Sequence, residues 1–176
     1  MPHAQRIAML LAAACLVLAV GACENTEPTA EERKVVEKTV LNYLHALADA
    51  YSSLNASPLE PFATQAEIQE VQKTLRGLAG TGDRVEARLL STEFNGVDIF
   101  REVNATVTLT EVWEVTRYDA FTGREKGKNP TSIQDSIIQL RLIDGRWMVT
   151  ARRVIGQEAG PRWNVEGGMG EASDPS

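Results

Sequence analysis

The spacing of apolar residues changes once along this chain, near Arg84, and that change limits the folds that the chain can adopt. Before Arg84, apolar residues recur every three or four positions, which is typical of one face of an amphipathic helix. After Arg84, apolar and polar residues alternate, which is typical of strands with one buried face. The sequence therefore predicts an α+β fold in which two N-terminal helices pack on an antiparallel sheet of about four strands.

Each predicted helix begins with a T-x-x-E pattern, the sequence signature of a capping box. The first box predicts a helix over residues 30–54, and the second opens a shorter helix that ends in a glycine-rich stretch. The two boxes are Thr29 with Glu32 and Thr64 with Glu67. The apolar face of the first helix, which we expect to be buried, consists of Val36, Val40, Tyr43, Leu44, Leu47, Tyr51 and Leu54.

Two dipeptides and one long polar segment divide the rest of the chain into strands. The Asn-Gly pair at 95–96 and the Asp-Gly pair at 144–145 are typical of tight hairpin turns. Residues 119–132 combine glycine, proline and charged side chains, which indicates an extended hairpin loop. We interpret its charged stretch, residues 124–128, as a solvated loop tip, with contact to an acidic partner or a lipid headgroup as the alternative. The predicted strands cover residues 84–94, 103–118, 133–143 and 146–154.

Residues 1–22 follow the order of a secretory signal peptide. Polar and basic residues come first, an apolar run from Ile7 to Val20 follows, and small residues lead to Cys23. The run is shorter than the roughly 20 apolar residues that a membrane-spanning helix needs. The segment resembles the signal of bacterial lipoproteins, and this resemblance implies cleavage before Cys23 and lipidation of the Cys23 sulfur by a diacylglyceryl group.

The same resemblance implies how the mature chain is organised and where it is located. We expect residues 23–29 to form a lipidated tether, residues 30–155 one folded domain, and residues 156–176, rich in Gly, Glu, Ser and Pro, a disordered tail. Lipoproteins retained at the inner membrane commonly have Asp after the acylated cysteine, whereas this chain has Glu24. We therefore expect a lipid-anchored protein of the bacterial cell envelope, on the periplasmic face of the outer membrane if the host has one.

The composition argues against several classes of function. With 18 Lys and Arg against 24 Asp and Glu, the chain has a formal net charge of −6, which disfavours nucleic acid as a partner. Cys15 lies in the signal and Cys23 at its cleavage point, so the folded part has no thiol for a disulfide or a zinc site. The histidine that remains after cleavage, His45, falls on the solvent side of the first helix. We expect no metal and no cofactor.

Two helices followed by long antiparallel hairpins, with a final Asp-Gly-x-Trp turn at residues 144–147, resemble the nuclear transport factor 2-like superfamily. The resemblance covers about residues 30–154 and implies a cystatin-like, cone-shaped domain with a curved sheet. Members include ketosteroid isomerase, scytalone dehydratase, polyketide cyclases and non-enzymatic binding domains. One apolar row is also similar to the intermembrane-space domain of plastid-division proteins, a non-catalytic partner-binding module. This row consists of Val103, Ala105, Val107, Leu109, Glu111 and Trp113.

Glu111 is the main candidate for chemistry because its carboxylate occupies the inward register of this apolar row. Tyr43, on the buried face of the first helix, and Asp135, in line with Ile133 and Ile137, are the other polar groups that can converge on the mouth of the cone. Resemblance to ketosteroid isomerase implies that a helix tyrosine and carboxylates inside the cone share proton transfer. These three residues are therefore the catalytic candidates.

Glu111 has two further interpretations that the sequence leaves open. A β-bulge near Thr110 would return its side chain to water, or the carboxylate forms an ion pair with Arg141 on a neighbouring strand. Trp113 is interpreted first as a core residue and second as a platform for a ligand. The ligand-binding candidates are therefore Tyr43, Glu111 and Trp113.

These observations predict a membrane-anchored envelope lipoprotein that acts as a non-catalytic binding module. Its expected partner is another protein or a small apolar ligand close to the membrane. The alternative is a pocket enzyme of the isomerase or hydro-lyase type that uses Glu111 with Tyr43 or Asp135. A homodimer formed through the open face of the sheet is compatible with either function.

Overall fold

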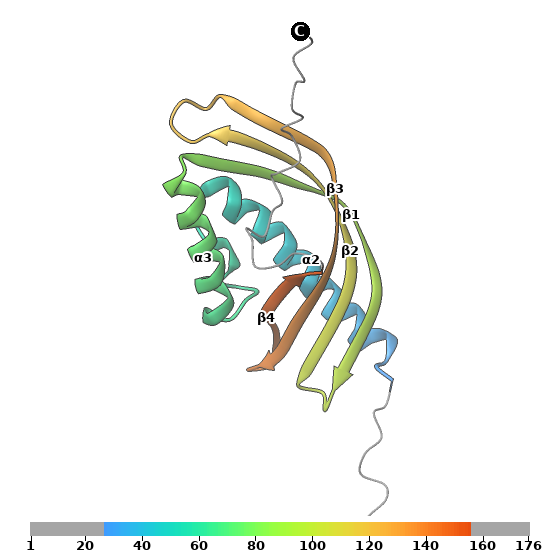
Figure 1. The fold of residues 1–176 in the computed structure, drawn as a ribbon. Helices are drawn as coiled ribbons and strands as arrows, with labels where there is room; N and C mark the ends of the chain where they lie inside the picture. The colour runs from blue at the N-terminus through green and yellow to red at the C-terminus, as the bar shows by residue number, and fades with distance from the viewer. Residues whose placement is uncertain (1–26, 156–176) are drawn as a thin grey trace, which may run out of the picture.

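A computed structural model describes residues 27–155 of the chain (Figure 1). The predicted signal peptide, the lipidation site Cys23 and the predicted disordered tail lie outside these residues. The described elements are helix α2 (Ala30–Ser53), the 3-10 helix η1 (Ser57–Leu59), helix α3 (Gln65–Gly80), and strands β1 (Asp83–Phe100), β2 (Asn104–Asp119), β3 (Glu125–Ile143) and β4 (Arg146–Val154). Among them, no helix is both long enough and apolar enough to cross a membrane.

The four strands form one antiparallel sheet in the order β1-β2-β3-β4. The sheet is strongly curved, and α2 lies in its concave side with α3 beside it (Figure 1). Apolar side chains of both helices and of all four strands meet there in one core. The predicted α+β class, with two helices on a curved sheet of four antiparallel strands, is confirmed.

The predicted turn at Asn95-Gly96 is wrong, because β1 continues through this pair to Phe100. The register with β2 shifts between Phe94 and Gly96, which marks a β-bulge. Glycine fits there because a Cβ at position 96 would lie 2.9 Å from the Thr108 hydroxyl oxygen. An earlier bulge, between Leu89 and Ser91, has the same effect on the alternation. Together the two bulges keep the apolar residues of one long strand on the helix side.

The chain reverses between β1 and β2 at Arg101 and Glu102, which have φ values of 51° and 56°. The Val103 N–H donates to the Phe100 carbonyl over 3.3 Å across this turn. Two consecutive residues with positive φ are typical of a type I′ turn, whose twist matches that of a hairpin. The turn therefore forms without the Asn-Gly pair that the sequence pattern favours.

The predicted long loop after β2 is also wrong, because β3 already begins at Glu125 and most of that segment is strand. Asp119 closes the short turn by accepting hydrogen bonds from the Thr122 N–H at 2.8 Å and the Thr122 hydroxyl at 3.0 Å. These bonds lower the pKa of Asp119 to about 2. Lys126 forms ion pairs with Asp83 at 2.8 Å and Asp119 at 3.3 Å, so part of the charged stretch supports the hairpin.

The two predicted capping boxes have different outcomes. At the start of α2, the Glu32 N–H donates to the Thr29 hydroxyl at 3.2 Å and the Thr29 N–H donates to the Glu32 carboxylate at 2.8 Å, as predicted. Thr64 is the N-cap of α3, but its side chain makes no capping hydrogen bond. The prediction of a second capping box is therefore wrong. The Glu67 side chain is instead buried in the interior of the domain.

Candidate functional site

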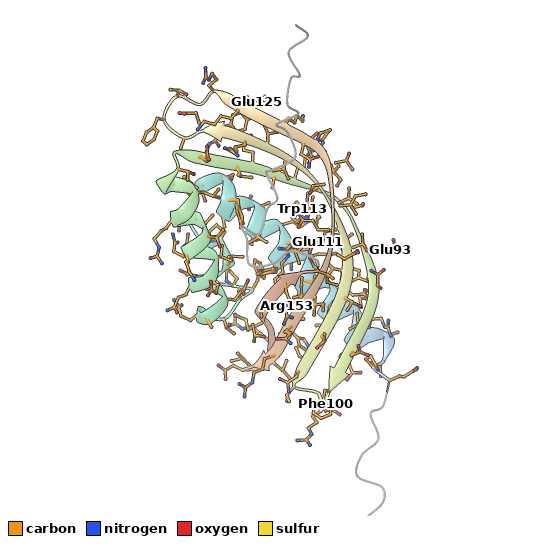
Figure 2. The ribbon with its side chains drawn as sticks, in the orientation of Figure 1. Glu93, Phe100, Glu111, Trp113, Glu125 and Arg153 are labelled. Atoms are coloured by element: carbon orange, nitrogen blue, oxygen red, sulfur yellow. The ribbon has the colours of Figure 1, made fainter. Side chains whose placement is uncertain are left out.

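Glu111 lies in the concave interior of the sheet, on the side that faces α2, and Trp113 follows it on the same face of β2 (Figure 2). The β1–β2 register runs without interruption from Phe94 and Leu109 to Ser91 and Val112. The bulge proposed near Thr110 is therefore absent from this pairing, and Glu111 keeps its predicted inward register. Residues 105, 107, 109, 111 and 113 are all buried, whereas Val103 at the start of the row is exposed.

Arg152 of β4 is the ion-pair partner of Glu111. Its Nη2 lies 2.6 Å from Glu111 Oε2 and its Nε lies 3.1 Å from Glu111 Oε1, so the pair is bidentate. Both side chains are 0% exposed. Glu111 thus forms an ion pair with an arginine of a neighbouring part of the sheet, as predicted. The predicted partner, Arg141, is wrong, because it is exposed at the far end of β3.

Two further side chains complete the surroundings of this ion pair. The Trp113 indole N–H donates to Glu111 Oε2 at 2.7 Å, and Arg152 Nη2 donates to the Gln134 side-chain oxygen at 3.2 Å. Burial by itself lowers the pKa of the Arg152 guanidinium, but the charge and hydrogen bonds of Glu111 raise it above its ordinary value. Glu111 therefore faces a permanent positive charge and accepts three hydrogen bonds.

The two helices contribute a second buried polar pair. The Tyr43 hydroxyl of α2 donates to Glu67 Oε1 of α3 at 2.5 Å, and both residues are buried. Tyr43 and Tyr51 also raise the pKa of Arg152 by their electrostatic interaction with it, so both phenols lie close to the guanidinium. The interior of the cone thus holds a polar cluster, which comprises Tyr43, Tyr51, Glu67, Glu111, Trp113, Gln134 and Arg152.

Asp135 does not belong to this polar cluster, and its predicted inward position is wrong. Its side chain is exposed on the outer face of the sheet, where it accepts a hydrogen bond from the Thr110 hydroxyl at 2.7 Å. Glu111 pairs with Gln134 across β2 and β3, so the even-numbered residues of this part of β3 face inward. His45 is exposed on α2, as predicted.

Three members of the polar cluster carry no clear signal in the sequence. Glu67 has the spacing of a helix cap, and Gln134 belongs to the alternate set of positions on β3. Arg152 lies one position out of the alternation set by Trp147 and Val149. The β3–β4 register shifts where Gln139 pairs with Ala151 and Leu140 pairs with Val149, and this bulge turns Arg152 inward. The alternation of apolar residues in this strand does not predict the bulge.

The arrangement constrains the chemistry that the polar cluster can perform. A general base needs an accessible lone pair and a pKa near the working pH. The Glu111 carboxylate is instead 0% exposed, and its two oxygens accept hydrogen bonds from the Arg152 guanidinium and the Trp113 indole, so it is not accessible to a substrate. In residues 27–155, no three His, Cys, Asp or Glu side chains are grouped as a metal site requires. The geometry is that of a closed structural ion pair.

Tyr43→Phe tests the pair between the helices. Phenylalanine keeps the packing of the ring but removes the donor to Glu67, whose carboxylate is only 2% exposed. Leaving a buried acceptor without this bond costs about 1–3 kcal/mol, so we expect the free energy of unfolding to fall by that amount in urea denaturation. Tyr118→Phe, at a partly exposed tyrosine, should change it by less than about 0.5 kcal/mol. Equal effects of the two substitutions would contradict a role for the Tyr43–Glu67 bond.

The chain matches no protein-family model and no curated protein. Among solved structures, it is similar to the intermembrane-space region of the chloroplast protein ARC6, with 14% identity and a TM-score of 0.61 over 72% of this chain and 98% of that one. A variant of Rv3472, a protein of unknown function from Mycobacterium tuberculosis, has 12% identity and a TM-score of 0.50 over 72% and 75%. An NTF2-like superfamily protein from Salmonella enterica has 10% identity and a TM-score of 0.47 over 77% and 93%.

At these identities the likeness concerns the fold alone. The domain has the nuclear transport factor 2-like, cystatin-like fold, and the predicted resemblance to this fold is confirmed. The resemblance of the β2 row to an intermembrane-space domain is also confirmed at the level of the fold.

Proposed function

We propose that this chain is a lipid-anchored protein of the bacterial cell envelope whose cone-shaped domain is a non-catalytic module for binding another protein. The anchor is proposed from the residues that lead to Cys23, which have the order of a lipoprotein signal. The single observation that supports a non-catalytic role is the closed ion pair between Glu111 and Arg152. It occupies the place where a pocket enzyme of this fold would need a reactive carboxylate.

We favour a protein partner over a small apolar ligand because the interior of the cone is charged, whereas exposed apolar surface lies on the outer face of the sheet. The interior contains a buried charged pair, and an apolar ligand there would have to disrupt the hydrogen bonds between Glu111 and Arg152 at a high cost. The outer face of the sheet, on the side of Glu93 (Figure 2), carries Ile133, which is 68% exposed and pairs with Val112. Together with the partly exposed Val112 beside it, Ile133 is the apolar contact that we propose for the partner.

The pocket-enzyme alternative retains Glu111 and Tyr43 inside the cone but loses Asp135 to the outer face. Within the described residues, Tyr43 donates to Glu67 and Glu111 accepts from Arg152. Catalysis would therefore require the exchange of both bonds for substrate contacts. No observation favours this alternative over binding.

The proposed binding role predicts a partner that depends on Ile133. A photocrosslinker placed at Ile133 in the full chain, expressed in cells, should give a discrete conjugate that is absent with the crosslinker at His45, an exposed residue of α2. After the conjugated protein is identified and purified, Ile133→Glu should weaken its binding at least tenfold. A conjugate of two copies of this chain would show that the partner is a second copy of the chain, and that the protein forms a homodimer through this face.

Native mass spectrometry of the chain purified from cells separates the remaining possibilities. We expect no retained small molecule. A retained mass that is lost in a Glu111→Gln variant that still folds would overturn the non-catalytic proposal and support the pocket enzyme.

A further inference from the structure

One end of the domain displays several large apolar side chains together. Among the described residues, Val35, Phe100, Val103 and Ile143 are each 37–47% exposed. Val35 lies in the first turns of α2, Phe100 and Val103 flank the β1–β2 turn, and Ile143 precedes the β3–β4 turn. Figure 1 shows these three segments at the same end of the molecule. We call these four residues the apolar end.

The two turns of the apolar end are held beside each other by the backbone. The Leu142 N–H donates to the Val103 carbonyl at 2.8 Å, which fixes the β3 terminus against the β1–β2 turn. The Arg101 guanidinium lies over the Phe100 ring, 4.9 Å from its centre. The β1–β2 turn and the end of β3 thus lie side by side at this end of the domain.

The position of the N-terminal segment favours a lipid bilayer as the partner of the apolar end. α2 begins at this end (Figure 1), and only residues 24–29 lie between the helix and Cys23. At about 3.5 Å per residue, this segment reaches no more than about 25 Å. A lipid on Cys23 therefore keeps the apolar end close to the bilayer, whereas the β2–β3 hairpin lies at the opposite end of the molecule (Figure 2).

The charges around the turns favour an apolar contact with lipid over an electrostatic one. Arg101, Arg141 and Arg146 are balanced by Asp98, Glu102 and Asp144, so the strand ends and turns here have no excess of basic residues to select anionic lipids. Aromatic rings and arginines are side chains that suit the boundary between headgroups and acyl chains. The expected contact is thus shallow and independent of lipid charge.

We propose that the apolar end docks on the lipid surface, so that the domain stands end-on with the β1–β2 turn in the headgroup region and the outer face of the sheet free for a partner. This orientation rests on the proposed lipidation of Cys23. It assigns Phe100 and Val103 a contact with lipid, while Ile133 keeps its separate contact with protein.

The experiment compares two turns at opposite ends of the acylated protein in phosphatidylcholine vesicles. Once Cys23 is acylated and Cys15 is removed with the signal, an introduced cysteine is the only free thiol. Glu102→Cys and Arg124→Cys, both at exposed turn residues, are labelled with a polarity-sensitive fluorophore. We expect the fluorescence of the label at 102 to be at least twofold higher than that of the same label on a soluble chain that lacks residues 1–23. Nitroxide-bearing lipids should quench it. The label at 124 should show neither change.

Phe100→Ser combined with Val103→Ser, in the Glu102→Cys background, tests which side chains hold the turn in the lipid. Both residues are exposed, so the fold should persist in circular dichroism, and the signal at 102 should fall to that at 124. Equal signals at 102 and 124 in vesicle-bound protein would overturn end-on docking and leave the anchor intact. An unacylated chain in the soluble fraction would overturn the anchor itself, and with it this orientation.

Discussion

Arg152→Met should lower the free energy of unfolding by about 3–5 kcal/mol, because it leaves the Glu111 carboxylate buried without its counterion. Methionine fills much of the volume of the arginine stem, so the loss reflects charge rather than a cavity. Domains of this size have a total stability of about 5–15 kcal/mol. Urea denaturation should therefore show a variant that is either strongly destabilised or unfolded at room temperature.

A second substitution should restore much of this loss. In the variant that combines Arg152→Met with Glu111→Gln, no charge remains buried, and the glutamine oxygen still accepts from the Trp113 indole, as Glu111 does at 2.7 Å. Its amide can donate to the Gln134 oxygen that Arg152 contacts in the native chain. Replacing a buried ion pair by neutral groups is often neutral or stabilising, so we expect the double variant to be more stable than Arg152→Met alone.

Arg88→Met provides the matched control at an exposed ion pair. Arg88 lies 3.2 Å from Glu114, but its side chain is 69% exposed, and exposed pairs contribute about 0–1 kcal/mol. A loss below about 1 kcal/mol for Arg152→Met, similar to that of Arg88→Met, would show that Glu111 is not buried as a charged group.

Periodicity predicts the parts of the polar cluster that lie on regular elements. Tyr43 follows the apolar face of α2, and Glu111 follows the row from Ala105 to Trp113, so both are placed inside the cone by spacing alone. The fold class follows from the same signal, because a helical period followed by an alternating one requires helices packed on a sheet. Local pattern is sufficient where the backbone has no irregularity.

The remaining residues depend on features that a local pattern does not contain. Arg152 faces inward because of a bulge in β4 opposite Gln139, and the same kind of bulge carries β1 through the Asn95-Gly96 pair. The prediction for Asp135 places it on the wrong face because β3 has isoleucines in both registers. Only its pairing with β2 chooses between them. Glu67 has the spacing of a cap but bonds to Tyr43, a contact between helices that is decided by tertiary packing.

These corrections affect which function the fold can serve. A carboxylate, a helix tyrosine and a second acid inside the cone would have matched the arrangement of a proton-transfer enzyme. Asp135 lies on the outer face, and both acids that lie inside the cone are already bonded, Glu111 to Arg152 and Glu67 to Tyr43. The proposed function therefore places the contacts with partners on the outer face of the sheet and at the apolar end.

Cys23→Ser should remove the protein from the membrane fraction or leave it as an unprocessed precursor. The Cys23 sulfur is the atom to which the proposed diacylglyceryl group is attached. The serine hydroxyl is a much weaker nucleophile and is not expected to be lipidated. Acyl chains contribute about 0.8 kcal/mol per buried CH₂ group, so loss of the lipid should change the distribution from almost entirely membrane-bound to soluble. Cell fractionation, with the intact mass of the purified protein, measures both processing and acylation.

Cys15→Ser is the matched control, because it also replaces a cysteine of the N-terminal segment by serine but lies within the apolar run of the signal. We expect it to be processed and membrane-bound like the native chain. The two proposed membrane contacts separate in the same assay, because Phe100→Ser with Val103→Ser should stay in the membrane fraction through its lipid. A Cys23→Ser protein that loses residues 1–22 and still remains in the membrane fraction would refute the lipoprotein assignment, since neither an acyl chain nor an uncleaved signal would then account for its attachment.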